Sequence, residues 1–127
     1  MELSVEVADS LAAKVAEIAK EGTYTLPPNE QQRLEKLYSY DVLDSQPEKE
    51  FDRITSMAAR VFDVPVCIVS LVDAGRNWMK SYHGLAASDA SDIPRCVSLC
   101  AHLLLPECGN DVYVVQVSDP APLLHAQ

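Results

Sequence analysis

The spacing of apolar residues predicts three helices in the first half of the chain. In the first, over residues 8–20, apolar side chains recur every three or four positions and would line one face. Gly22 and the Pro27–Pro28 pair then mark a short, stiff linker. A second helix is expected from Asn29, because Asn29 and Gln32 have the spacing of a capping box.

The third predicted helix has the strongest pattern of the three. Ser45 and Glu48 again have capping-box spacing, and Pro47 suits a first helical turn. The helix would bury one apolar face before Pro65 prevents its continuation. That face consists of Phe51, Ile54, Met57, Ala58, Val61 and Phe62.

Two strands are expected next, joined by a turn at residues 73–76. Residues 66–72 are largely apolar at both odd and even positions, so both faces of a strand would be apolar. This pattern is typical of a strand buried on both faces at the centre of a sheet. Residues 77–82 would form its partner, since their period of two places alternate side chains on opposite faces. One face would carry Trp78, Lys80 and Tyr82.

The remaining pattern predicts one more helix and one more strand. Residues 94–105 have a helical apolar face made by Val97, Cys100, Ala101, Leu104 and Leu105. Residues 111–117 are rich in valine and read as a strand after a turn at 109–110. The order of elements favours an α+β fold, with an antiparallel sheet and helices on one side.

Composition and charge narrow the classes of function that we expect. The chain has 127 residues, enough for one domain, and a net charge of −9 without a basic cluster. We therefore expect neither nucleic acid nor a membrane as a partner, because both present negative charge. The sequence contains neither a spanning apolar segment nor a secretory signal pattern, so a cytoplasmic location is expected.

The cysteines are the candidates for metal binding or thiol chemistry. Cys96, Cys100, His102 and Cys108 lie close in sequence, but they lack the paired spacing of zinc sites, and packing as small apolar groups is favoured. Cys100 would need a nearby base to act as a nucleophile, and His102 would point elsewhere on a helix. Motifs for nucleotide binding or hydrolysis are absent from the sequence. We expect a protein that is not an enzyme and that has neither a metal nor a cofactor.

Five residues are candidates for binding a small ligand. Arg95 would recognise an anionic group, and Trp78 would offer an aromatic surface. The alternatives are that Arg95 is exposed at a helix start, that Ser98 satisfies backbone groups and that Trp78 simply packs. The candidates are Trp78, Arg95, Ser98, Cys100 and His102.

Several motifs in order resemble those of a GAF domain, of the type attached to bacterial-type histidine kinases and diguanylate cyclases. The first block is residues 29–85, with Tyr-Asp-x-Leu-Asp at 40–44, Val-Ser-Leu-Val-Asp at 69–73 and Trp-x-Lys-Ser at 78–81. Residues 95–102 look like the Arg-x-x-Ser-Phe-Cys-x-His signature of that group, with Leu99 in place of its phenylalanine.

The resemblance implies a sensory or regulatory module that binds a small molecule or relays a signal to an output domain such as a kinase or cyclase. It divides the chain into an N-terminal helix and linker, residues 1–28, and a partial GAF domain, residues 29–127. The later strands of the family are not found, so the sheet would be incomplete. A homodimer that pairs through the sheet would cover strand 66–72. Alternatives are a dimerisation or protein-interaction module without a ligand, and a thiol-based reductase.

Overall fold

The structure, a computed structural model, describes residues 5–22, 24–109, 112 and 114. It confirms the α+β prediction. The elements in order are α1 (Val5–Glu21), α2 (Glu30–Ser39), α3 (Lys49–Val61), β1 (Cys67–Val72), β2 (Arg76–His83), β3 (Ile93–Pro94), a 3-10 turn (Arg95–Val97), α4 (Leu99–His102) and a second 3-10 turn (Pro106–Cys108).

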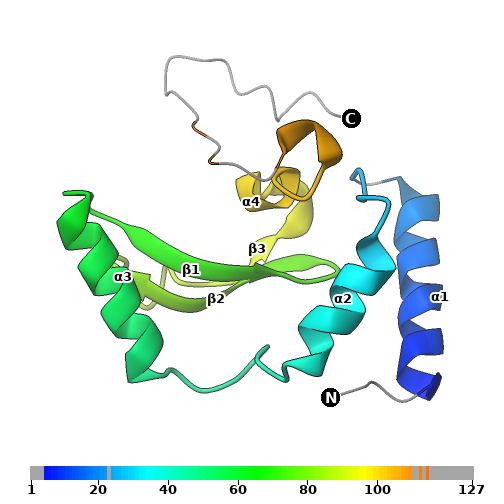
Figure 1. The fold of residues 1–127 in the computed structure, drawn as a ribbon, viewed down its shortest axis with the longest axis horizontal. Coiled ribbons are helices and arrows are strands. Elements are labelled where there is room, and N and C mark those ends of the chain that lie inside the picture. Colours follow the sequence, from blue (N-terminus) through cyan, green and yellow to red (C-terminus); the bar gives the residue numbers. More distant parts are fainter. Residues whose placement is uncertain (1–4, 23, 110–111, 113, 115–127) are drawn as a thin grey trace.

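The sheet has the strand order β1-β2-β3, with both pairs antiparallel. Helices α2 and α3 lie below opposite ends of the sheet in Figure 1, α1 lies outside α2, and α4 lies on the other side of the sheet. Among the described residues β1 is therefore an edge strand, and the prediction that it is central and buried on both faces is wrong. Its Ile68 is 38% exposed.

A β-bulge in β2 changes the predicted alternation of side chains. Val69 pairs with Ser81 while Ser70 pairs with Met79, so Lys80 is the extra residue. Lys80 and Ser81 are consequently both buried, although strict alternation would place them on opposite faces. The pattern of apolar and polar residues in the sequence does not predict an inserted residue.

Helix α1 packs on α2 through a small apolar cluster, as its predicted face implies. Leu11, Leu34 and Ala74 are buried in this cluster. The half-buried residues around them are Val15, Ile18, Leu37 and Tyr38. Ala74 belongs to the turn between β1 and β2, so the cluster joins both helices to the sheet.

Both predicted capping boxes are wrong in detail, although their helices are present. Asn29 and Glu48 are the N-cap residues of α2 and α3, and neither side chain makes a capping hydrogen bond. The Ser45 hydroxyl instead donates to the Val42 carbonyl, 2.6 Å away. Pro47 therefore lies ahead of α3 rather than in its first turn.

The apolar face of α3 is not buried as predicted. Its buried residues are Thr55 and Ala59, whereas Met57 is 62% and Val61 71% exposed. Polar contacts to β2 set this orientation, because the Ser81 hydroxyl donates to the Asp52 carboxylate at 2.7 Å and lies 3.0 Å from the Thr55 hydroxyl. The side of α3 with the greatest hydrophobicity points away from the sheet.

The predicted helix over residues 94–105 is broken into short pieces. Ile93 and Pro94 pair with Asn77 and Arg76 as β3, and the extended backbone of Ser98 separates the 3-10 turn from α4. Val97 is exposed instead of lining an apolar face. The predicted strand 111–117 lies outside the described residues, apart from the irregular positions 112 and 114.

Candidate functional site

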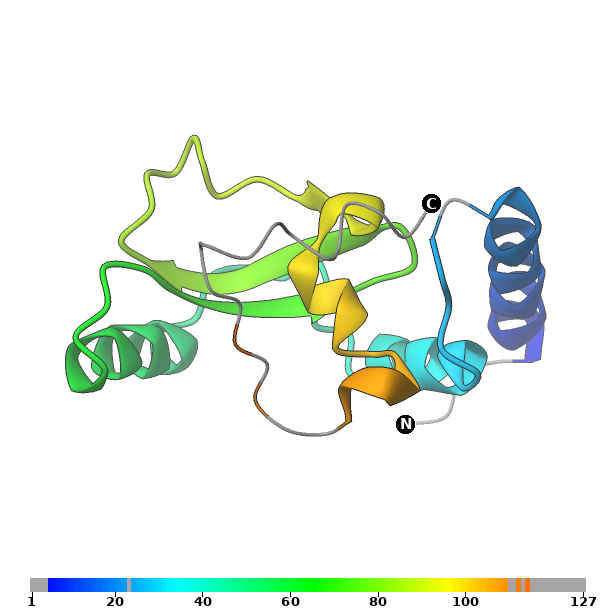
Figure 2. The same ribbon diagram turned by 90° about the horizontal axis from the view of Figure 1, so that it is seen from above.

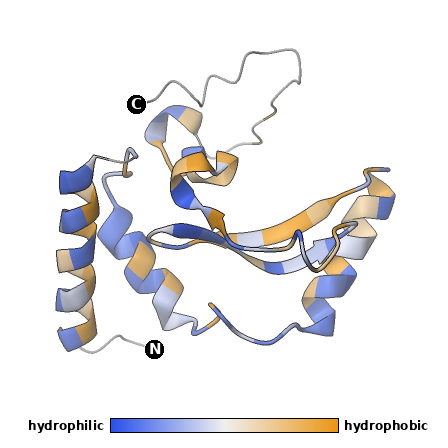
Figure 3. Cartoon of the chain, turned by 180° about the vertical axis from the view of Figure 1, so that it is seen from behind, coloured by the Kyte–Doolittle hydropathy of each residue, from blue (hydrophilic) through white to orange (hydrophobic). Residues whose placement is uncertain are grey.

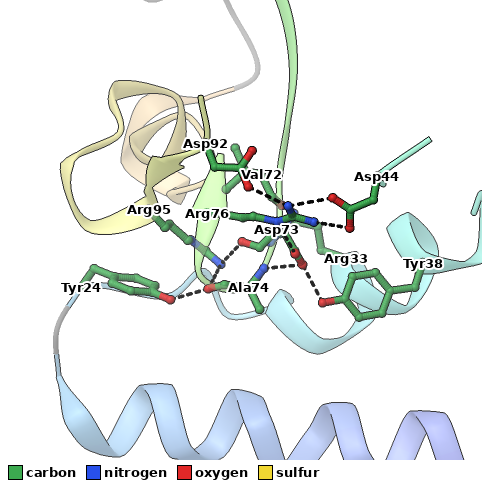
Figure 4. A network of polar contacts seen from close by, with 10 residues as sticks. All are labelled: Tyr24, Arg33, Tyr38, Asp44, Val72, Asp73, Ala74, Arg76, Asp92 and Arg95. Atoms are coloured by element: carbon green, nitrogen blue, oxygen red, sulfur yellow. Dashed lines mark hydrogen bonds and ion pairs between the residues drawn. The ribbon is translucent and has the colours of Figure 1, made fainter. Parts of the chain in front are cut away.

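The turn between β1 and β2 is a point where side-chain hydrogen bonds from several segments converge. The amide of Asp73 donates to the Arg76 carbonyl at 2.8 Å and closes the turn. Three successive carbonyls, those of Val72, Asp73 and Ala74, accept hydrogen bonds from side chains of other segments (Figure 4). The donors are Arg33 of α2, Arg95 of the 3-10 turn and Tyr24 of the linker after α1. We call these residues, with Glu30, Tyr38 and Arg76, the turn junction.

Arg95 occupies the interior of the turn junction. The residue is 1% exposed, and its Nη1 donates to the Glu30 carboxylate and to the Asp73 carbonyl, the latter at 3.2 Å. Its backbone amide donates to the Gly75 carbonyl at 3.0 Å, and its guanidinium lies 5.0 Å from the centre of the Tyr24 ring. The alternative that Arg95 is an exposed residue at a helix start is therefore wrong.

Glu30 holds the two arginines of the turn junction together. Its carboxylate accepts from Arg33 Nε at 3.0 Å and Arg33 Nη2 at 2.8 Å, and it also accepts from Arg95. Burial alone would raise the pKa of Glu30, but the hydrogen bonds from the two guanidinium groups outweigh it and lower that pKa. The charged form of Glu30 is therefore the one that the fold stabilises.

Asp73 is the second buried carboxylate of the turn junction. It accepts from the Tyr38 hydroxyl at 2.6 Å and from the Ala74 amide at 2.7 Å. Burial would raise the pKa of Asp73, but these bonds and Arg76 lower it. For Tyr38, burial and the bond to Asp73 both raise the pKa. The phenol thus stays a donor and the carboxylate stays an acceptor.

Arg76 closes the outer side of the turn junction, facing three aspartates. Its guanidinium contacts Asp44 at 2.7 Å, Asp92 at 2.7 Å and Asp73 at 3.3 Å. The hydrogen bonds that Arg76 donates to Asp44 and Asp92 raise the pKa of Arg76, so its charge is permanent. The loop between α2 and α3, through Asp44, and the residue before β3, Asp92, are thereby tied to one side chain (Figure 4).

The structure places three of the predicted ligand residues near one another. His102 Nδ1 lies 3.2 Å from the Ser98 carbonyl, and Cys100 Sγ lies 3.9 Å from the Ser70 hydroxyl of β1. Ser98 is buried, while Cys100 and His102 are half-buried. Because His102 is oriented to a backbone carbonyl, no hydrogen bond between it and Cys100 is found within the described part of the chain.

Trp78, the fifth predicted residue, belongs to a different cluster around Lys80. The Lys80 ammonium is bound by the Ser45 hydroxyl at 2.7 Å, the Gln46 carbonyl at 2.8 Å and the Glu48 carboxylate at 2.5 Å. It lies 6.0 Å from the Trp78 ring centre and 5.3 Å from that of Phe51. With three acceptors for its three donors, Lys80 serves to fasten the start of α3 to β2.

Sequence reasoning found Arg95 but missed its partners Tyr24 and Glu30, and it also missed Tyr38, which bonds Asp73 in the same junction. The residue types of these partners do not by themselves indicate a buried contact, since acidic and tyrosine residues are common on helix surfaces. One signal was present: Glu30 precedes Arg33 by three positions, and the stretch also contains Leu34 of the buried stripe. Across the described ranges, no group of three histidine, cysteine or acidic side chains is placed to hold a metal. All four cysteines are free thiols.

Comparison with known proteins gives a distant relative. No protein-family profile matches the chain. A stretch of 89 residues, 70% of this chain, is 28% identical to a cyclic di-GMP phosphodiesterase of Pseudomonas aeruginosa. The chain spans 14% of the length of that protein. Of the helices that the structure describes, none is both long and apolar enough to cross a membrane.

Proposed function

We propose that this chain is a GAF-type regulatory module that relays conformational change between its N-terminal helices and its sheet, without catalysing a reaction. The observation that carries the proposal is the turn junction. Segments 24, 30–38 and 95 each bond to the same three-residue turn, so a shift of one segment changes the contacts of the others. The turn junction is therefore suited to coupling elements that are distant in sequence.

Two further observations support a regulatory role. The motifs of the sequence resemble GAF modules of signalling proteins, and the relative named above is a cyclic di-GMP phosphodiesterase. We infer that an output domain, on the same or another polypeptide, would receive the relayed change. Helix α1 is the natural route, because it contacts the rest of the described structure mainly through α2 and the turn at Ala74.

Hydrogen exchange on Tyr24→Phe tests the relay. This variant keeps the ring beside Arg95 but removes the hydroxyl that bonds Ala74. We expect faster amide exchange both in the linker after α1 and in the turn between β1 and β2. The matched control is Tyr40→Phe, because Tyr40 is 65% exposed. Faster exchange confined to residues beside position 24 would contradict the relay.

A second candidate function, small-molecule sensing, rests on unpartnered buried atoms. Arg95 Nε, Arg95 Nη2 and Ser98 Oγ are buried without a hydrogen-bond partner among the described residues. Buried donors of this kind favour a polar ligand, because leaving them unsatisfied costs about 1–3 kcal/mol each. A surface hollow of about 380 Å3 begins at Pro28 and Asn29, directly before Glu30, and continues along residues 103–106.

Thermal melts in the presence of ligands test the sensing candidate. A ligand that binds the folded chain raises its melting temperature by mass action. The panel would include cyclic di-GMP, other nucleotides, tetrapyrroles and amino acids, and a hit should be weakened by Ser98→Ala. The absence of a shift with every compound would leave relay as the better proposal. For the thiol-reductase alternative, redox activity that survives both Cys96→Ser and Cys100→Ser would exclude cysteine chemistry at those positions.

A further inference from the structure

The guanidinium of Arg95 is hydrogen-bonded along one side only. Its Nη1 donates to the Glu30 carboxylate and to carbonyls of the turn between β1 and β2, whereas Nε and Nη2 are buried without a hydrogen-bond partner among the described residues. The N–H groups of Nε and Nη2 lie side by side, and together they can bind two oxygens of one anion through parallel hydrogen bonds. The unpaired atoms of Arg95 therefore make up one complete binding edge.

The charges around this edge leave an excess of positive charge. Glu30 is bound by Arg95 and also by Arg33, whose Nε and Nη2 donate to it at 3.0 and 2.8 Å. Two guanidinium groups thus share one carboxylate, and the carboxylate of Asp73 is engaged by other donors of the turn junction. A buried charge is costly unless it is paired, so an anion at the free edge of Arg95 would be stabilised.

Ser98 adds a third unpaired group on the same 3-10 turn. Its amide donates to the Arg95 carbonyl at 3.1 Å, and residues three apart on such a turn lie on the same side of it. Ser98 is 3% exposed, and its Oγ has no hydrogen-bond partner in the described ranges. Between Ile93 and Ala101, Arg95 and Ser98 are the only charged or hydroxyl-bearing residues. Figure 3 shows the short helix α4, which follows them, as mostly hydrophobic.

We propose that the Nε–Nη2 edge of Arg95 and the hydroxyl of Ser98 bind the phosphate group of a small organic phosphate. The inference rests on the second candidate function, small-molecule sensing, and it names the class of ligand. A phosphate group has three terminal oxygens, so Nε, Nη2 and Ser98 Oγ can each donate to a different one. A carboxylate has two oxygens, and the edge of Arg95 would use both.

The uncharged part of the ligand has a place beside this edge. The hollow of about 380 Å3 lies between the start of α2 and the segment after α4, which are the neighbours in sequence of Glu30 and Ser98. Its lining includes residues 103–105, all leucine, and such a lining suits an apolar group. Because the edge of Arg95 is buried, a ligand reaches it only when a covering group moves. The ring of Tyr24, centred 5.0 Å from the guanidinium, is such a group (Figure 4).

Thermal melting with inorganic phosphate as the probe tests the proposal. Phosphate titrated into the millimolar range at constant ionic strength should raise the melting temperature of the full chain by about 2–5 °C at roughly ten times its Kd. Acetate under the same conditions should raise it less. The nitrogen resonance of Arg95 Nε should shift with the same dependence on phosphate concentration, which places the anion at this edge.

Two variants separate binding from a structural role. Arg95→Lys keeps a charge beside Glu30 but lacks the two-donor edge, so it should lose the response to phosphate. Ser98→Ala should weaken phosphate binding by about tenfold, yet without phosphate it should melt no lower than the wild type, because it removes an unpaired buried hydroxyl. A Ser98 with a purely structural role would instead lower the melting temperature when replaced. Ser88→Ala, in an exposed loop, is the matched control.

Three results would overturn the proposal. The first is a wild-type chain in which phosphate changes neither the melting temperature nor the Arg95 Nε resonance. The second is a phosphate response that persists unchanged in folded Arg95→Lys and Ser98→Ala, because the anion then binds elsewhere. The third is an acetate response as large as that of phosphate. Stabilisation by a ligand without phosphate would leave sensing intact while removing this assignment, and the relay is judged separately by hydrogen exchange in Tyr24→Phe.

Discussion

At the scale of single residues, Glu30 is a buried acid that joins two arginines. It is 3% exposed and accepts hydrogen bonds from both Arg33 and Arg95. A buried ion pair contributes little beyond what apolar residues would, but removing one partner leaves the other charge without compensation. The importance of Glu30 therefore lies in the arginines that would be left if it were lost.

Replacing Glu30 by glutamine should lower the free energy of unfolding by about 3 kcal/mol, because the buried Arg95 guanidinium then lacks its carboxylate. Urea unfolding of the variant and the wild type measures this loss. Glu35→Gln is the control, since Glu35 lies on the same helix and accepts a hydrogen bond from Gln31 at the surface. Equal losses in both variants would show that the turn junction does not depend on the Glu30 charge.

Gly84 is a second position where one residue type is required. Its φ is +80°, and an added Cβ would lie 1.9 Å from the Pro65 carbonyl oxygen. We expect Gly84→Ala to cost more than about 2 kcal/mol, because the chain must move at both Gly84 and Pro65. Gly75→Ala should change stability by less than about 0.5 kcal/mol. At Gly75 an added Cβ would meet nothing within 4 Å. Thermal melts of the two variants provide the comparison.

At the scale of elements, α1 and α3 attach to the rest of the chain by different means. Helix α1 docks through apolar contacts of Leu11 with the cluster that contains Leu34 and Ala74. Helix α3 docks through hydroxyl and carboxylate contacts to Ser81 and leaves its apolar flank open. The first element is held by burial and the second by polar contacts, and this difference explains why α3 retains an exposed apolar flank.

Truncating Leu11 to alanine should detach α1 from the remainder of the structure. The lost contacts are worth about 2–5 kcal/mol for a buried leucine. Amide exchange in α1 should accelerate toward that of an isolated helix, because α1 has no other apolar docking site among the described residues. Val5→Ala is the control on the same helix, since Val5 is 78% exposed. Unchanged exchange in α1 after Leu11→Ala would contradict this account of docking.

At the scale of the whole molecule, the two N-terminal helices, the sheet and the 3-10 turn are joined through one small region. Figure 2 shows α1 and α2 at one end of the sheet and α3 at the other, with β1 and β2 running between them. The turn junction lies at the α2 end. Its buried charges make the stability of the assembled structure depend on pH.

Stability should fall as the solution is acidified, because Glu30 and Asp73 both have a lower pKa in the folded chain than in the unfolded chain. Their contribution is complete above the ordinary carboxyl pKa of about 4 and is lost as the pH falls through the lower folded values. Urea unfolding from neutral pH down to about 3 measures the trend. Asp73→Asn should flatten the decline, whereas Asp89→Asn, in an exposed loop, should not. A decline of the same steepness in Asp73→Asn would contradict the assignment.

The local pattern of the sequence determined which segments are helices and strands. Apolar residues at helical spacing placed α1, α2 and α3 close to their observed bounds, a β-branched run placed β1, and the alternating pattern after the turn placed β2. These features depend on neighbours in sequence, so a single chain suffices to predict them. The α+β class followed from their order. Arg95 was recognisable as a candidate residue because it opens a motif.

Only the tertiary structure decided how those elements are oriented and which charges meet. The bulge at Lys80, the outward flank of α3 and the break of residues 94–105 at Ser98 arise from contacts between distant segments. The turn junction has the same origin, since Glu30 and Arg95 are 65 residues apart. Apolar periodicity predicts that a face exists but not what covers it. Burial is a property of the assembled chain.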